Sequence, residues 1–193
     1  MVVAIITLFL TVVLIKRSTF ENGINLENVA YEAILSIRSA QMMGSNGRIP
    51  AGESRSVPYG VRVVPNSSDI KVFVDENQDL KYDTAPSPSD KFIEQYSIPK
   101  NKGTFSRFCV TDQFGGVETG AGLKCSNTSG NNYTALDMVF TRPDVTPYFS
   151  VYKGSNGSTL VGSNYKEAVI YMKSTEGIEQ GIIIVSQGLI YVQ

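Results

Sequence analysis

Hydrophobic residues dominate the start of the chain. The first fifteen residues read MVVAIITLFLTVVLI, a run without charge, and Lys16 and Arg17 follow at once. A helix of that length is about 22 Å long, shorter than the roughly 30 Å hydrocarbon core of a bilayer. Three interpretations compete: a cleaved secretory signal, a buried core helix, and a membrane helix whose first turn or two precedes Met1. We favour the third, because a signal would carry its basic residues before the apolar run.

A second pattern follows the basic pair. Between Leu26 and Met43 the apolar residues recur at spacings of three and four, which places them on one stripe of a helix: Leu26, Val29, Ala30, Ala33, Ile34, Ile37, Ala40 and Met43. Gly44, Gly47 and Pro50 are stop signals. We therefore predict an amphipathic helix whose apolar stripe needs a partner. Asn22-Gly23, two poor helix formers, mark a joint at which the helix could kink or break.

After Gly47 the pattern changes to short runs rich in β-forming residues, separated by turn residues. The predicted strands are Tyr59–Val64, Ile70–Val74, Phe105–Thr111, Leu136–Thr141, Tyr148–Tyr152, Lys166–Lys173, Gln180–Val185 and Leu189–Val192. Glu176-Gly177 and Gln187-Gly188 separate the last three, which predicts a closing antiparallel meander. We expect an α+β fold with one long N-terminal helix packed on an antiparallel β-sheet head. The expected parts are an apolar helix over residues 1–17, an amphipathic helix over 18–47 and a β-rich globular head over 48–193.

Composition narrows the chemistry. The chain has 193 residues, 17 basic and 18 acidic side chains, and no histidine. The net charge of −1 provides no general attraction for nucleic acid. Without histidine there is no Ser-His-Asp or Cys-His nucleophile and no histidine-ligated zinc, and two cysteines cannot complete a four-cysteine zinc site. These absences argue against the commonest enzyme classes.

Several short motifs, in this order, resemble the type IV pilin and type II secretion pseudopilin superfamily, and most closely its minor pilin and pseudopilin group. The first fifteen residues look like the apolar half of the prepilin helix, and AILSIRSAQMM over residues 33–43 looks like its second half. Further similar motifs are Tyr59-Gly60-Val61, Lys71-Val72-Phe73-Val74-Asp75 with Asn77 and Tyr82-Asp83, Met138-Val139-Phe140-Thr141-Arg142-Pro143, and Gln187-Gly188-Leu189-Ile190.

The resemblance implies a structural, non-enzymatic subunit of a pilus or pseudopilus filament. Such a subunit would wait in the cytoplasmic membrane and then assemble outside the cell, with other copies or other pilins, through an inner-membrane assembly machinery. The residues expected in the lipid bilayer and then in the filament core are Val2, Val3, Ile5, Ile6, Leu8, Phe9, Leu10, Val12, Val13, Leu14 and Ile15. The alternative is a membrane-anchored extracytoplasmic binding module that captures DNA or adheres to a surface.

Cys109 and Cys125 lie sixteen residues apart on either side of a glycine-rich stretch. In a head outside the cytoplasm they would form a disulfide, which stabilises a loop of this length by about 3 kcal/mol. Two free buried thiols are the alternative.

Asp75, Asn77, Asp79 and Asp83 place oxygen ligands at alternate positions, like the start of an EF-hand-type calcium loop. Leu80 stands where that loop needs glycine, and no glutamate occupies the closing position. We therefore favour a polar turn held by side-chain hydrogen bonds, with calcium as the one cofactor candidate. The same aspartates are the candidates for a carboxylate-based hydrolase, a class we disfavour. We expect no catalytic residues.

Four sequons, at Asn66, Asn127, Asn132 and Asn156, mark surface loops and candidate glycosylation sites.

A small basic-aromatic patch for DNA could form where Lys100, Lys102 and Arg107 lie near Phe105 and Phe108 in the sequence. We favour ordinary solvated loop charges at these positions.

Overall fold

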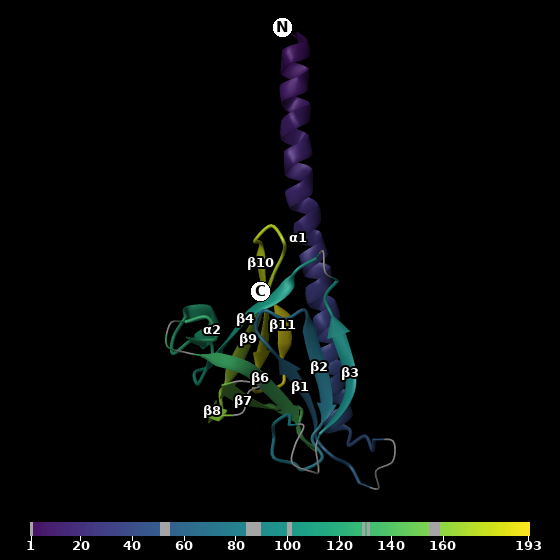
Figure 1. The fold of residues 1–193 in the computed structure, drawn as a ribbon, viewed down its shortest axis with the longest axis vertical. Helices are drawn as coiled ribbons and strands as arrows, with labels where there is room; N and C mark the ends of the chain where they lie inside the picture. Colours follow the sequence, from purple (N-terminus) through teal and green to yellow (C-terminus); the bar gives the residue numbers. More distant parts are fainter. Residues whose placement is uncertain are drawn as a thin grey trace.

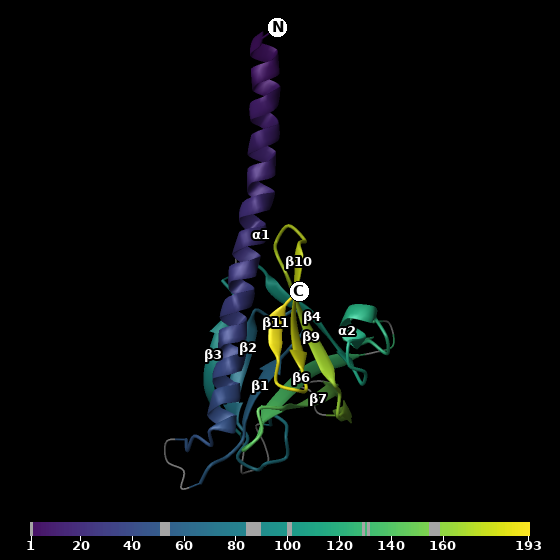
Figure 2. The ribbon, with the colours of Figure 1, turned by 180° about the vertical axis from the view of Figure 1, so that it is seen from behind.

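A long helix runs along one side of a β-rich head in the computed structural model (Figures 1 and 2). The structure describes residues 2–50, 55–83, 90–99, 102–128, 130, 132–154 and 159–193. In the first helix it describes the side chains of residues 2, 3, 5–7, 10, 11 and those from 23 onward. Helix α1 spans Val2–Ser45, and a single helical turn, α2, spans Gly116–Thr119.

The strands form two antiparallel sheets. The six-stranded sheet has the order β3-β2-β1-β6-β7-β8, with β1 Tyr59–Val63, β2 Asp69–Val74, β3 Lys91–Ser97, β6 Tyr133–Phe140, β7 Pro147–Lys153 and β8 Thr159–Ser163. The five-stranded sheet has the order β11-β10-β9-β4-β5, with β4 Thr104–Thr111, β5 Lys124–Cys125, β9 Glu167–Lys173, β10 Glu179–Val185 and β11 Ile190–Val192. The α+β class and the antiparallel pairing are thus as predicted, but the head holds two sheets where one was expected.

The eight predicted strands are present, each within three residues of its predicted bounds. The closing meander is confirmed, because β10 pairs with both β9 and β11 in antiparallel register. Three strands were missed: β3, β5 and β8. Each of these lies at the edge of a sheet, and β3 and β8 are exposed along almost their whole length.

One face of α1 is buried against both sheets. The predicted apolar stripe from Leu26 to Ala40, called here the inner stripe, is almost inaccessible to solvent and shares one core with residues of β1, β2, β4, β6, β7, β9, β10 and β11. Met43 is half-buried and packs on a smaller cluster of Val57, Tyr59 and Val74. The helix therefore closes the core between the two sheets.

Asn22-Gly23, where the sequence allowed a kink or a break, does not interrupt this helix. Two poor helix formers cost about 1–2 kcal/mol in a helix interior. Helix formation is cooperative, so long helical stretches on both sides outweigh a local penalty of that size. The apolar and amphipathic parts therefore form one continuous rod.

Hydrogen bonds from the polar side chains of α1 fix its position on the head. Gln41 Nε2 donates to the carbonyl oxygens of Val145 at 2.8 Å and Gly188 at 3.1 Å. Arg38 donates to the carbonyl oxygen of Ile190 at 3.1 Å. The Tyr96 hydroxyl on β3 donates to the Glu32 carboxylate at 3.0 Å. These bonds tie the helix to both sheets and set its register along them.

A buried ion pair organises the outer face of the six-stranded sheet. Arg62 on β1 binds Asp137 on β6 through two hydrogen bonds, of 2.7 and 2.8 Å. Asp137 also accepts a hydrogen bond from the Tyr82 amide at 2.9 Å, and the Tyr82 ring lies on Phe73 and below the Arg62 guanidinium. The chain after β2 is thereby held down over the sheet. Gly60 makes room for this, since a Cβ there would lie 2.2 Å from the Phe73 ring.

We expect Gly44→Ala to lower the free energy of unfolding by about 1–3 kcal/mol. A Cβ at Gly44 would lie 2.5 Å from the Phe140 carbonyl oxygen, so α1 would have to move away from β6. The matched control is Gly23→Ala in the same helix, where nothing lies within 4 Å of the new methyl group. That change should stabilise the chain by about 0.5–1 kcal/mol, because alanine favours the helix. Urea unfolding measures both, and equal effects would contradict the close approach at Gly44.

Candidate functional site

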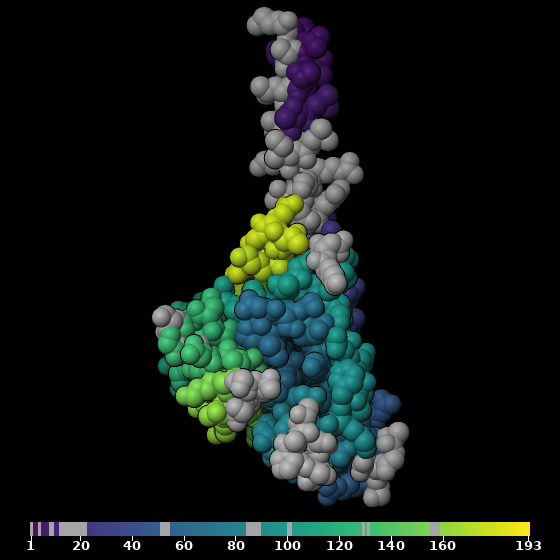
Figure 3. All heavy atoms as spheres, viewed as in Figure 1, coloured from purple at the N-terminus to yellow at the C-terminus, as the bar shows by residue number. Residues whose placement is uncertain are grey.

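The N-terminal part of α1 stands clear of the head (Figure 3). Its described apolar side chains are 53–73% exposed: Val2, Val3, Ile5, Ile6 and Leu10. The first residue of the inner stripe is Leu26, so α1 continues for about 36 Å before that point. The remaining predicted core residues, Leu8, Phe9, Val12, Val13, Leu14 and Ile15, lie outside the described side chains. The described part is an apolar helical surface without a partner in this chain.

The two threonines in this segment add little polarity to its surface. Thr7 Oγ1 donates to the Val3 carbonyl oxygen at 3.1 Å, and Thr11 Oγ1 donates to the Thr7 carbonyl oxygen at 2.7 Å. Bonds to the preceding turn satisfy a hydroxyl within its own helix. Among the described residues, no helix has both the length and the hydropathy that crossing a membrane requires.

The four predicted calcium ligands lie in one turn, residues 75–83, called here the acidic turn. Asp75 is fully buried, and its carboxylate accepts hydrogen bonds from the amides of Asp79 at 3.2 Å and Leu80 at 2.9 Å. Asn77 Oδ1 also accepts from the Asp79 amide at 3.2 Å. Backbone amides of the turn therefore already bond to the oxygens of two of the four candidate ligands, Asp75 and Asn77.

A lysine occupies the space between the other two acids. Lys81 Nζ lies 3.0 Å from Asp79 and 3.1 Å from Asp83. The described residues contain no group of three or more histidine, cysteine or acidic side chains suited to a metal ion. This geometry is that of the polar turn favoured from the sequence, and a bound calcium ion would have to displace the Lys81 ammonium group.

Leu80 adopts the backbone conformation for which the calcium loop would use glycine. Its φ is +63° and that of Gln78 is +61°, both in the left-handed region that side chains other than glycine disfavour. The bond from the Leu80 amide to Asp75 holds this strained turn in place. A leucine at this position was therefore no obstacle to the turn geometry.

Asp90 completes the acidic turn from outside it. Its carboxylate accepts hydrogen bonds from the amides of Glu76 at 3.2 Å and Asp83 at 2.8 Å, and the residue is buried. Burial raises the pKa of Asp75 to about 6, against the lowering effect of the Leu80 amide. Burial, together with the charges of Asp75 and Asp83, raises the pKa of Asp90 to about 7. Two acids of this turn thus titrate near neutrality.

We expect the free energy of unfolding to increase as the pH falls from 8 to 5. The folded chain holds the protons of Asp75 and Asp90 more tightly than the unfolded chain, whose carboxyl groups titrate near 3.8. Their contribution is complete below that value and is lost as the pH rises through about 6 and 7. The expected gain is on the order of 4 kcal/mol, since one pKa unit corresponds to about 1.4 kcal/mol. Urea unfolding at several pH values measures it.

The double variant Asp75→Asn/Asp90→Asn should lose most of this pH dependence. The exposed Asp144→Asn variant should keep it, because that carboxyl lies in solvent. An unchanged slope in the double variant would rule out these two acids as its source.

The predicted disulfide is present. Cys109 on β4 is bonded to Cys125 on β5, and the two residues face each other in the sheet register. The loop between them contains α2. Glu167, which the sequence analysis did not single out, is buried and accepts hydrogen bonds from the amides of Gly115 and Val117. A covalent bond and a buried carboxylate therefore hold the same loop.

We expect reduction of this disulfide to lower the free energy of unfolding by about 3 kcal/mol, since the open loop gains conformational entropy in the unfolded chain. Denaturant unfolding with and without reductant measures the loss. The double variant Cys109→Ala/Cys125→Ala should be insensitive to reductant. A mass measurement that finds two free thiols in the untreated protein would contradict the bond.

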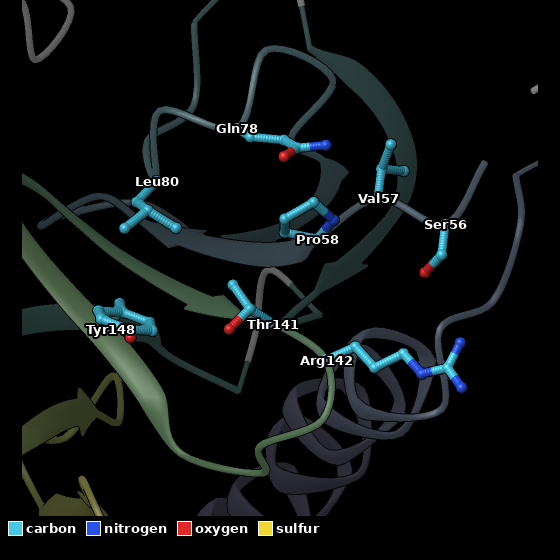
Figure 4. Close-up of a pocket in the computed structure, with 8 residues that line it drawn as sticks. All are labelled: Ser56, Val57, Pro58, Gln78, Leu80, Thr141, Arg142 and Tyr148. Carbon is cyan, nitrogen blue, oxygen red and sulfur yellow. The ribbon is translucent and has the colours of Figure 1, made fainter.

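A depression of about 320 Å³ lies near the C-terminal end of α1, away from the N-terminal segment (Figure 4). It is lined by Ser56, Val57, Pro58, Gln78, Leu80, Thr141, Arg142 and Tyr148. Arg142 extends away from its centre (Figure 4). No acidic side chain is among these lining residues, so they contain no carboxylate pair of the kind a hydrolase uses.

The two aromatic rings considered for a basic-aromatic patch are not at the surface. Phe105 and Phe108 are fully buried in the core, so neither ring is accessible to a nucleotide base. Arg107 is paired with Glu179 at 2.9 Å and lies over the Tyr171 ring. Lys100 lies outside the described residues.

The sequon asparagines Asn66, Asn127 and Asn132 are exposed, as surface loops require. Asn156 lies outside the described residues.

Comparison with known proteins adds no relative to this description. No protein-family model, curated protein or solved structure matches the chain.

Proposed function

We propose that this protein is a structural subunit of an extracellular filament of the type IV pilus or pseudopilus kind. The N-terminal segment of α1, residues 2–15, would lie in the filament core, with the β head outside. The observation that supports this most directly is the exposure of the apolar side chains of Val2, Val3, Ile5, Ile6 and Leu10, on a helix that continues unbroken into the head. The proposed pilin-like head is an expectation from the sequence resemblance.

Burial of that surface supplies the driving force for assembly. Full burial of one large aliphatic side chain contributes roughly 1.5–3 kcal/mol. The five described side chains are more than half exposed, so their burial is worth roughly 5–10 kcal/mol before the entropy of association is subtracted. Since the segment and the head differ, neighbouring copies meet through different surfaces. Such a head-to-tail contact, when repeated with a shift along the helix axis, extends without closing and produces a helical filament.

Before assembly, the same N-terminal segment would lie in the lipid bilayer. Its apolar side chains cost little in a bilayer, where the helix satisfies its own backbone hydrogen bonds. Lys16 and Arg17 would then lie at the membrane interface. In this proposal the subunit is stored in the cytoplasmic membrane and an inner-membrane machinery extracts it. The Cys109–Cys125 bond is consistent with a head in an oxidising compartment.

We expect the full chain to form filaments and a chain lacking residues 1–15 to remain a soluble monomer. Negative-stain electron microscopy and sedimentation measure assembly, and the unfolding curve checks that the truncated head is folded. A point variant, Ile6→Arg, should reduce filament yield at least tenfold, since an unpaired charge in an apolar core is costly.

The matched control is Leu189→Arg, which places the same charge at an equally exposed leucine on the head. It should assemble normally. Filaments from the truncated chain would contradict the proposed role of the segment. A full chain that stays as isolated anchored copies would support the binding module instead.

A further inference from the structure

The face of α1 that points away from the head carries a second apolar stripe. Four large side chains that are 44–66% exposed form it: Ile24, Tyr31, Leu35 and Met42. We call this set the outer stripe. The helix lies along the outside of the head over this length (Figure 2), and the inner stripe already packs on the sheets. The outer stripe is therefore not needed for the fold of one chain.

The spacing of the outer stripe is that of a helix–helix contact. Its members are seven, four and seven residues apart. At 100° per residue they lie within an arc of about 40° and extend over about 27 Å. Spacings of seven and four define the contact seam of two packed helices, whereas scattered surface residues would show no such line. The geometry therefore favours a helix as the partner.

The charged side chain nearest the line of the outer stripe, that of Arg38, bonds to the head. Arg38 falls between Leu35 and Met42 in sequence, but its guanidinium donates to the Ile190 carbonyl oxygen on the head. Glu32, beside Tyr31, accepts a hydrogen bond from the Tyr96 hydroxyl. Both charges are thus held by contacts with the head. Glu27 is exposed and lies about 60° from the line of the stripe, so it is a charge at the border of the contact and not within it. A neutral, apolar helix can then lie on the stripe itself without desolvating a charge there.

We propose that the outer stripe binds the N-terminal segment, residues 2–15, of a second copy. This inference rests on the proposed function and names the partner surface for that segment. The segment is helical and apolar, contains no charge, and is about 20 Å long, comparable to the stripe. Two parallel copies shifted by about 37 Å bring the middle of the segment next to the middle of the stripe.

A symmetric pairing of two outer stripes suits the surfaces less well. It would close as a dimer and leave Val2 to Leu10 exposed in both copies. The shifted contact buries a segment of one copy and a stripe of the other at once, and the pair still offers one free segment and one free stripe. Repetition of the contact then extends the filament.

Cysteine cross-linking of the full chain tests the contact directly. Ile6 and Tyr31 are 25 residues apart, which matches the expected shift, and the native cysteines are already bonded to each other. Under mild oxidation, the double variant Ile6→Cys/Tyr31→Cys should give a ladder of covalent multimers. Ile6→Cys/Leu160→Cys, with its second cysteine on exposed β8, should stay monomeric. Dimers from Tyr31→Cys alone, or a ladder from the β8 pair, would overturn the inference.

An assembly assay separates this inference from the proposed function. Leu35→Arg should reduce filament yield at least tenfold without lowering the melting temperature, since this side chain is 66% exposed in the single chain. The matched control Leu160→Arg should assemble like the unmodified protein. Normal assembly of Leu35→Arg, together with loss of assembly on deletion of residues 1–15, would refute the outer stripe and leave the filament role standing. Absence of filaments from the unmodified chain would refute both.

Discussion

Burial of the inner stripe of α1 is the contact on which the rest of the structure depends. The stripe joins residues from both sheets into one core, so the helix holds the two sheets together. Small residues make this contact close: Ala30, Ala33 and Ala40 are fully buried, and Gly44 lies against the Phe140 backbone. Because the head buries only one face of the helix, the opposite face and the N-terminal part are free to contact other molecules.

The sequence predicted the elements whose pattern is set by burial. The three-and-four spacing from Leu26 onward predicts the inner stripe, and runs such as Lys166–Lys173 predict strands, because a buried face imposes its period on the residues. Strand β3, KFIEQYS, is exposed along nearly its whole length and carries no such period. Strand β5 has only two residues and pairs beside the disulfide. The division into two sheets depends on strand pairing across long stretches of chain, which local patterns do not encode.

The candidate sites likewise divide into those that local sequence predicts and those that depend on contacts between distant parts of the chain. The disulfide and the exposed N-terminal segment follow from composition and spacing, so the sequence predicts them. Glu167 and the Arg62–Asp137 pair do not, because each binds groups about 50 to 75 positions away in the chain. For the acidic turn, the sequence predicted which residues lie together. The favoured polar turn already implied hydrogen bonds from backbone amides to these oxygens. The position of Lys81 between Asp79 and Asp83 was not predicted, since that contact depends on the folded turn.

Continuity of α1 through Asn22-Gly23 links the two ends of the molecule mechanically. In an unbroken helix each residue turns by about 100° and rises by 1.5 Å relative to the last. The contacts of Gln41 and Arg38 with the head fix the rotation of the helix. They thereby also fix the direction in which Ile6 and Leu10 point relative to the sheets. A flexible joint would let a head rotate freely about its own N-terminal segment, whereas the continuous helix allows packing of that segment to determine the orientation of the head.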